Sequence, residues 1–287
     1  MYQAYWGFTE KPFENTPDPR FFYATPKHEE ALMRMLYAVK EHKSAAMLSG
    51  EYGSGKTLLT RLITSHLLND SNKYNVAVII NPALSADELL VEIIYQLGKT
   101  PTSNCRKGDL LRELNTLLYT INQQNKHTVI IIDEAQAIRD EKTLEELRLL
   151  LNFQLNDRFL LTLLLFGQPE LRQKINQVRQ FDQRLALRYH LYHLTETEIS
   201  GYIKHRCEVA GVQHDIFTTD GCNTIYAFSE GIPRLINTIC DTALLVGMNR
   251  ELKEINQDII EEVSVDLNLP VHQGGSAVGM TERQVYQ

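Results

Sequence analysis

The stretch GEYGSGKT at residues 50–57 limits what this chain can fold into more than any other feature. It has the Gly-x4-Gly-Lys-Thr spacing of a phosphate-binding loop, the Walker A motif. Such a loop lies between a strand and a helix. Residues 47–50 are short and apolar, and residues 58–68 have helical apolar spacing. The sequence therefore predicts a strand, a phosphate loop and a helix in this order.

The chemistry of phosphate binding explains each position of the loop. Glycines let backbone N–H groups approach phosphate oxygens, and the next helix directs its positive N-terminus at them. Lys56 would reach the β- and γ-phosphates, and Thr57 would offer its hydroxyl to Mg²⁺. The residues expected to contact ATP are Gly50, Glu51, Tyr52, Gly53, Ser54, Gly55, Lys56, Thr57 and Leu58.

Asp133 and Glu134 form a second motif. They follow an apolar run at residues 129–132 that is typical of a buried strand. Acids at the carboxyl end of a parallel strand lie beside the phosphate loop. Asp133 would hold Mg²⁺, and Glu134 would polarise the attacking water as general base. The structural alternative is a strand that simply ends in solvated acids.

The order of elements predicts an α/β fold with a second, helical part. Strand and helix patterns alternate up to about residue 194, and the strands are apolar on both faces, which favours a five-stranded parallel sheet covered on both sides. Only helical patterns follow, and the first begins with a capping box from Thr195 to Glu198. We expect a segment with the first helix at 1–44, a core at 45–194, a small all-helical lid at 195–265 and a flexible tail at 266–287.

Composition narrows the class of protein. Of the 287 residues, 43% are apolar and 23% are charged, which is typical of globular proteins. The net charge of −7 argues against a protein that mainly coats nucleic acid, although it allows a local basic patch. No signal peptide and no apolar run of membrane-spanning length is visible. We expect a cytoplasmic chain with no membrane span of its own.

Five segments together resemble a known family, the AAA+ ATPases of the ExeA/GspA type. The opening GFTEKPFENTPDPRFFYATPKHEEAL is similar to that family's N-terminal signature, and the similarity continues through GEYGSGKT, IIIDEAQ, FGQPELR and GIPRLIN. The resemblance extends from about residue 5 to 265. It implies a P-loop ATPase core with a helical lid, ATP and Mg²⁺ as cofactors, and assembly into a ring or filament.

The resemblance also implies roles outside the Walker motifs. Gln168 matches a sensor position that contacts the γ-phosphate or the attacking water, although Pro169 also suits a helix start there. Arg234 matches a second sensor that reaches from the lid, or it is an ordinary surface arginine. The family's arginine finger, which enters a neighbouring subunit's site, corresponds best to Arg184. Arg188 is the runner-up, and Arg179 stays open.

The N-terminal segment carries a stiff, aromatic strip with two interpretations. Either it stacks against the adenine base, or it covers an edge of the sheet. Its members are Pro12, Phe13, Pro17, Pro19 and Tyr23.

Three functions fit the sequence. The resemblance favours an ATPase that assembles secretion or pilus machinery in the envelope together with a protein partner. Longer family members continue into a membrane span and a peptidoglycan-binding domain, and we expect neither in this chain. An ATP-dependent transposition regulator that assembles on duplex DNA and recruits a transposase is the second hypothesis. A nucleotide-gated scaffold with little turnover is the third, and Glu134 argues against it.

Overall fold

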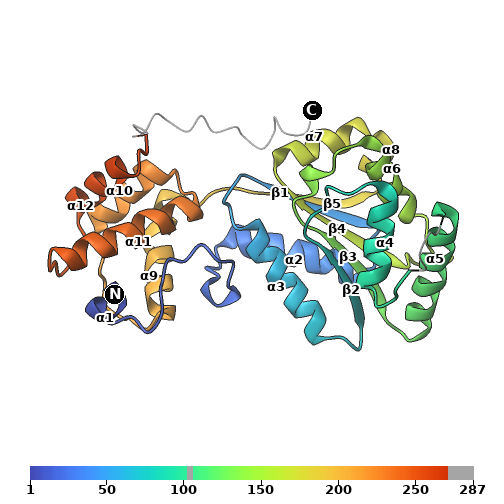
Figure 1. The fold of residues 1–287 in the computed structure, drawn as a ribbon, viewed down its shortest axis with the longest axis horizontal. Helices are drawn as coiled ribbons and strands as arrows, with labels where there is room; N and C mark the ends of the chain where they lie inside the picture. The colour runs from blue at the N-terminus through green and yellow to red at the C-terminus, as the bar shows by residue number, and fades with distance from the viewer. Residues whose placement is uncertain (102–105, 271–287) are drawn as a thin grey trace. The chain divides into compact units, whose positions relative to one another are not determined.

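The computed structural model describes residues 1–101 and 106–270. They divide into two compact units (Figure 1). Residues 17–192 form an α/β unit, and residues 1–16 together with residues 193–270 form a helical unit. Most of the predicted tail, residues 271–287, lies outside the described residues.

The α/β unit is built on a five-stranded sheet with the order β2-β3-β4-β1-β5. All neighbouring strands pair in parallel, as the continuous apolar runs predict. The strands are β1 (Ala45–Gly50), β2 (Tyr74–Ile79), β3 (His127–Ile132), β4 (Leu161–Gly167) and β5 (Leu185–Leu191).

Helices cover both faces of this sheet because successive strand residues point to opposite sides. In β1, Ala45 and Met47 belong to one core cluster, and Ala46 and Leu48 belong to another. The first cluster packs against α4 (Ala86–Gln96), α5 (Lys107–Gln123), α6 (Glu141–Leu150), α7 (Pro169–Gln177) and α8 (Arg179–Asp182). The second packs against α2 (Pro26–Lys40) and α3 (Lys56–Asn69). Two short 3₁₀ turns complete the unit, η1 (Pro19–Phe21) and η2 (Ala135–Ala137).

The helical unit is all-helical apart from one isolated bridge between Phe217 and Ile255. Its helices are α1 (Tyr2–Trp6), α9 (Glu196–Val209), α10 (Thr219–Ser229), α11 (Pro233–Asn249) and α12 (Gln257–Asp266). The predicted capping box is present: Thr195 caps α9, and its N–H donates to Glu198 Oε2 at 2.8 Å.

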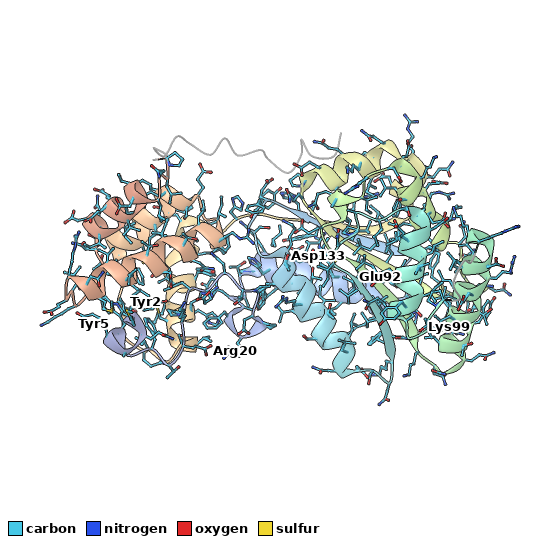
Figure 2. The ribbon with its side chains drawn as sticks, viewed as in Figure 1. Tyr2, Tyr5, Arg20, Glu92, Lys99 and Asp133 are labelled. Carbon is cyan, nitrogen blue, oxygen red and sulfur yellow. The ribbon has the colours of Figure 1, made fainter. Side chains whose placement is uncertain are left out.

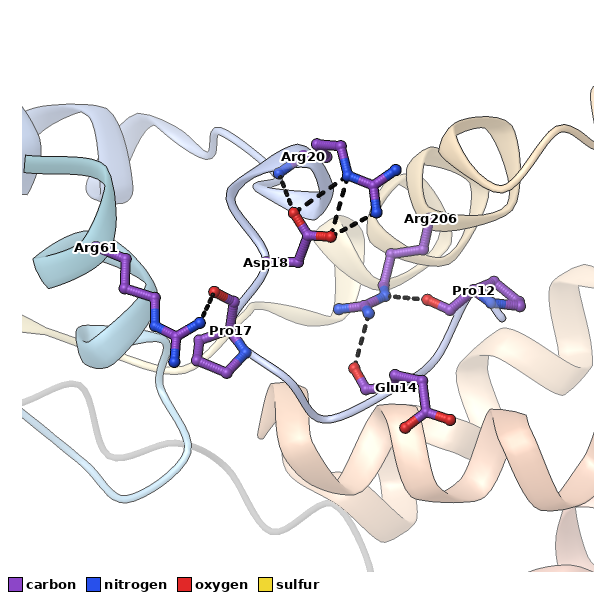
Figure 3. Close-up of polar contacts among 7 residues, drawn as sticks. All are labelled: Pro12, Glu14, Pro17, Asp18, Arg20, Arg61 and Arg206. Atoms are coloured by element: carbon purple, nitrogen blue, oxygen red, sulfur yellow. Dashed lines mark hydrogen bonds and ion pairs between the residues drawn. The ribbon is translucent and has the colours of Figure 1, made fainter. Parts of the chain in front are cut away.

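The first sixteen residues are held in the helical unit by a buried arginine, Arg206 of α9. Its guanidinium donates to the carbonyl oxygens of Pro12 at 2.6 Å and Glu14 at 3.0 Å (Figure 3). Phe13, which lies between these two residues in the sequence, is buried. Its ring packs edge-on against Phe217, with ring centroids 5.8 Å apart. Charge-assisted bonds from a buried arginine fix the backbone they reach. Phe13 is thus a core residue of this unit, unlike either interpretation of the aromatic strip.

The predicted segment at 1–44 is divided by the structure. Residues 1–16 join the helical unit, whereas residues 17–44 join the α/β unit, where Arg61 of α3 donates to the Pro17 carbonyl at 3.1 Å (Figure 3). The helical unit resumes at residue 193, two residues before the predicted start of the lid. Local patterns do not reveal this division because the contacts that cause it join segments about 190 residues apart.

Two histidines, His42 and His127, are hydrogen-bonded to each other at the amino ends of β1 and β3. Thr162 Oγ1 donates to the Lys43 carbonyl, so it accepts from His127 Nε2–H at 2.8 Å. His127 Nδ1 then accepts from His42 Nδ1–H at 2.9 Å. Burial, followed by the nearby His42, lowers the pKa of His127 to about 3. His127 is therefore a neutral, buried member of the structure at neutral pH.

This histidine is expected to make the fold sensitive to acid. Below the unfolded pKa of about 6.5, the unfolded chain binds a proton that the folded chain excludes, so stability falls until about pH 3. Between pH 7 and 5 the expected loss is about 2 kcal/mol of unfolding free energy. Urea unfolding at pH 7 and pH 5 should show a smaller loss of unfolding free energy for His127→Gln than for wild type. This should hold even though the variant is less stable than wild type at pH 7. The exposed His66→Gln should keep the wild-type loss, and an equal loss in all three proteins would contradict the assignment.

Among the described residues, no helix combines the length and apolar character that a membrane crossing requires.

Candidate functional site

The phosphate loop lies between the end of β1 and the start of α3, the context that the sequence predicts. Gly53 and Gly55 have φ angles of 76° and 98°, which side chains rarely adopt. A Cβ on Gly50 would come within 2.7 Å of the Leu191 carbonyl oxygen. The glycines are therefore required by the backbone path of the loop and by its close approach to β5.

Lys56 is held against the loop it follows. Its side-chain nitrogen donates to the carbonyl oxygens of Gly50 and Glu51, both at 2.7 Å, and the residue is only 6% exposed. Burial lowers its pKa, whereas the charges of Glu134 and Asp133 act in the opposite direction. A buried ammonium that is held by only two carbonyls is well suited to bind phosphate oxygens.

Thr57 and Asp133 come together although they are 76 positions apart. The carboxylate of Asp133 lies just beyond β3, is 4% exposed, and is hydrogen-bonded to the Thr57 hydroxyl and to the Glu134 N–H at 3.0 Å (Figure 2). Burial is the main reason that its pKa is raised. A hydroxyl and a carboxylate are hard oxygen donors of the kind that Mg²⁺ prefers.

The donor set fits Mg²⁺ and not a metal held by protein alone. Within residues 1–101 and 106–270, no group of three or more His, Cys, Asp or Glu side chains is placed to hold a metal ion. Mg²⁺ commonly binds through one or two protein oxygens together with phosphate oxygens and water. Thr57 and Asp133 meet this requirement beside a phosphate loop.

Glu134 is held by a residue that sequence reasoning missed, Gln136. Glu134 has a left-handed backbone with φ 50°, and its carboxylate accepts a hydrogen bond from Gln136 Nε2. Gln136 Oε1 accepts from the backbone N–H of Gln168 at 2.9 Å. One amide side chain thus connects Glu134 to the end of the neighbouring strand β4. The sequence signal that could have identified Gln136 is its position two residues after the acid pair.

Gln168 lies between β4 and α7, where it can be either a sensor at the end of a strand or the start of a helix. It is the N-cap residue of α7, Pro169 follows, and its side chain makes no capping hydrogen bond. Since β3 and β4 are neighbours, Gln168 and Asp133 follow adjacent strand ends. Its sensor role stays a prediction.

Lys174 and His28 also support the site, although no sequence pattern marks either residue for that role. Lys174 of α7 donates to the carbonyl oxygens of Gln136 at 2.6 Å and Ile138 at 2.7 Å, which fixes the turn after the acid pair. His28 of α2 is buried, with Nδ1 2.7 Å from Thr25 Oγ1 and Nε2 3.3 Å from the Ser54 carbonyl of the phosphate loop. The loop and the acid turn are each fixed by a helix outside the motifs.

The candidate arginines lie in different elements, and Arg184 lies at the opposite end of β5 from the phosphate loop. Arg184 follows α8 and directly precedes β5, and its guanidinium donates to Asn152 Oδ1 at 3.2 Å. The end of β5 that reaches Gly50 is about 20 Å further along the strand. Arg188 lies within β5 and donates to the Asp182 carboxylate at 2.8 Å. Arg179 begins α8, and Arg234 is the second residue of α11 in the helical unit. Their functional roles stay predictions.

If Glu134 is the predicted general base, replacing Gln136 with Ala should release it and lower the ATP turnover number by about 10- to 100-fold, because Glu134 loses its support. The KM for ATP should change less than the turnover number, since Gln136 reaches the site only through Glu134 and the backbone N–H of Gln168. Gly167→Ala should act in the same direction, because its Cβ would lie 2.8 Å from Gln136 Oε1. Steady-state kinetics would test this, with the exposed Gln173→Ala on α7 as the control. Unchanged turnover in Gln136→Ala would show that Glu134 needs no such support.

Comparison with known proteins places this site in context. Residues 39–175 match the family described as the AAA domain. The chain is 36% identical over 255 residues to General secretion pathway protein A of Aeromonas hydrophila, which covers 87% of this chain and 45% of that protein. It is 24% identical over 165 residues to an uncharacterized HTH-type transcriptional regulator of Methanocaldococcus jannaschii, covering 56% and 40%. The chain spans less than half the length of each of these relatives.

Solved structures with the same fold include three proteins at low identity. The Aeropyrum pernix ORC2 protein has a TM-score of 0.63 at 16% identity, covering 93% of this chain and 73% of that one. Cdc6p from Pyrobaculum aerophilum has 0.68 at 16%, covering 90% and 72%. The Thermotoga maritima RuvB Holliday junction branch migration motor has 0.58 at 19%, covering 85% and 70%. Together with the parallel sheet, these likenesses confirm the predicted α/β core followed by a helical domain.

Proposed function

We propose that this chain, an AAA+ protein of the ExeA/GspA type, binds and hydrolyses ATP with Mg²⁺ to drive the assembly or remodelling of a macromolecular complex. The observation that carries the proposal is the meeting of Thr57 and Asp133 beside Lys56 and Glu134. These are the groups that phosphoryl transfer to water requires.

Each residue has a distinct part in the proposed reaction. The loop N–H groups and the N-terminus of α3 bind the phosphates, and Lys56 exchanges its carbonyl partners for β- and γ-phosphate oxygens. Thr57 and Asp133 would hold Mg²⁺, which when bound would neutralise charge on the phosphates. Glu134 accepts the proton of the attacking water, and Gln136 keeps its carboxylate in position. Gln168 and Arg234 would report the nucleotide state as sensors.

The site is completed in trans in this proposal. Arg184 is about a strand length from its own phosphate loop, so it serves a neighbouring copy of the chain. A ring or filament of identical subunits therefore forms the active species, with Arg188 and then Arg179 as the alternatives for the finger. An arginine supplied in this way neutralises charge that develops on the γ-phosphate.

The relative named for general secretion favours envelope machinery as the complex, with a secretion or pilus protein as partner. The fold likeness to ORC2, Cdc6p and RuvB does not distinguish this use from target selection on duplex DNA with a transposase. Hydrolysis itself distinguishes both from a scaffold.

Phosphate release from ATP by the purified chain tests the activity. We expect turnover that requires Mg²⁺, is removed by EDTA, and is lost in Lys56→Ala. Lys142→Ala, an exposed lysine at the start of α6, should keep wild-type turnover. ATP binding without turnover under every condition, including high protein concentration, would leave only the scaffold function.

A further inference from the structure

A basic residue precedes every strand of the sheet. Lys73, Lys126 and Arg184 stand directly before β2, β3 and β5, Lys43 stands two residues before β1, and Arg158 stands three residues before β4. Because all five strands are parallel, these residues lie along the end of the sheet where the strands begin, which we call the amino edge. The phosphate loop lies at the opposite end, where the strands finish. The strand order gives the sequence of this amino-edge row as Lys73, Lys126, Arg158, Lys43 and Arg184.

The amino-edge row is long enough to contact an extended ligand. Neighbouring strands are about 4.8 Å apart, so five of them span about 19 Å. The side chains of Lys73 and Arg158 are 70% and 49% exposed, and their partners Asp70 and Asp157 are exposed as well. Exposed ion pairs of this kind contribute little and exchange readily for another anion. The row thus presents cations that an external ligand can engage.

A hollow of about 490 Å³ lies at the β2–β3–β4 end of the row. Its lining includes Lys40, Lys73, Lys126 and Arg158 together with the amides of Asn122 and Asn125, and no acidic residue. The whole chain carries a net charge of −7, so a hollow lined by cations and neutral donors is a local reversal of the overall charge.

The two histidines that line this hollow are neutral at neutral pH and are held by hydrogen bonds. His42 and His127 both line it, and they are joined to each other and through Thr162 to the Lys43 carbonyl. Burial lowers the pKa of both histidines. The charge at the amino end of the sheet therefore comes from the lysines and Arg158.

We infer that the amino-edge row is a binding surface for the sugar–phosphate backbone of a nucleic acid. A duplex carries one negative charge for about every 1.7 Å of its axis, so a line of cations about 19 Å long meets several phosphates at once. Lysine, arginine and asparagine are side chains that contact phosphate oxygens without reading sequence. Lys73, Lys126 and Arg158 are independent of the ATP site, which lies at the other end of the strands, whereas Arg184 at the far end of the row is the proposed finger for a neighbouring site.

Lys43, Lys73 and Lys126 also follow the C-termini of α2, α3 and α5, where positive charge stabilises helix ends. A purely structural role would therefore change stability and leave binding unchanged. The experiment separates the two roles by measuring both quantities on the same variants.

Fluorescence anisotropy with a labelled 30-base-pair duplex of arbitrary sequence tests the inference, with and without ATP and between 50 and 200 mM salt. The triple variant Lys73→Ala, Lys126→Ala, Arg158→Ala should bind at least tenfold more weakly. Its slope of log affinity against log salt should be shallower by about 2.7, which corresponds to three lost phosphate contacts. Arg112→Ala, Lys142→Ala, Lys253→Ala removes the same charge from exposed positions elsewhere and should bind like wild type.

Three results would overturn the inference. These are no binding of duplex or single-stranded DNA by wild type at 50 mM salt, binding that the triple variant retains, and equal losses in both triple variants. Vesicles with anionic lipids serve as a further probe, and binding to them alone would assign the surface to a membrane. Urea unfolding checks that the amino-edge variant is folded. Basal ATP turnover should persist in it, so failure of DNA binding and failure of the proposed ATPase are distinguishable.

Discussion

Replacing Glu134 with Gln should lower the ATP turnover number by about 10²- to 10⁴-fold while the affinity for ATP stays close to wild type. The amide has the shape of the carboxylate, and its oxygen can still accept the hydrogen bond from Gln136. It cannot accept a proton from water. The left-handed backbone at position 134 costs Gln no more than Glu. The variant therefore removes the base and keeps the site.

Phosphate release and binding of a fluorescent ATP analogue would together measure this separation. Glu141→Gln, which neutralises an exposed acid in the first turn of α6, is the matched control and should match wild type in both. A variant that hydrolyses ATP at more than a tenth of the wild-type rate would show that another group activates the water. Lost nucleotide binding would instead mean that Glu134 holds the site together.

Replacing Arg184 with Ala should lower turnover by about 10³-fold or more, because an arginine supplied in trans stabilises the charge of the transition state. The ammonium of Lys56 remains in the variant, so nucleotide binding should persist. The Arg184 side chain gives up its hydrogen bond to Asn152 Oδ1, which is a single exposed contact, so the fold should tolerate the change. Arg188→Ala is the matched comparison, since its guanidinium is engaged by Asp182 of the same chain.

Mixing two inactive variants would reveal the trans contribution directly. Lys56→Ala subunits keep Arg184 but lose their own site, whereas Arg184→Ala subunits keep the site but lose the finger. An equimolar mixture should regain a substantial fraction of wild-type turnover that neither variant has alone. A mixture as inactive as its components, when the Arg188→Ala mixture recovers, would transfer the role to Arg188.

The sequence predicted the features whose signals are local. The Walker A loop, the acid pair after β3, the five parallel strands and the capping box at Thr195 each occupy a few consecutive residues. The supports of the site were missed for the opposite reason. His28 reaches Ser54 across 26 positions, and Lys174 reaches Gln136 across 38, so no short pattern marks either contact.

The same argument applies to the N-terminal segment. Its prolines and aromatics were visible, but the partners of Pro12 and Phe13 lie about 200 positions further along the chain, whereas Pro17 is held by Arg61. A pattern of apolar residues does not say which distant surface it fits. The amino-edge row was likewise invisible until the strand order was known, because its five members are scattered between residues 43 and 184.

The clamp of Arg206 on Pro12 and Glu14 has a consequence for how the protein is made. A ribosome delivers the chain from its N-terminus at about 5 to 20 residues per second. The α/β unit has all of its residues once position 192 has emerged, yet residues 1–16 still await a partner helix that begins at Glu196. The oldest part of the nascent chain is therefore among the last to find its native contacts. Its buried aromatics, Trp6 and Phe13, stay exposed throughout that interval and would be natural sites for a chaperone to hold.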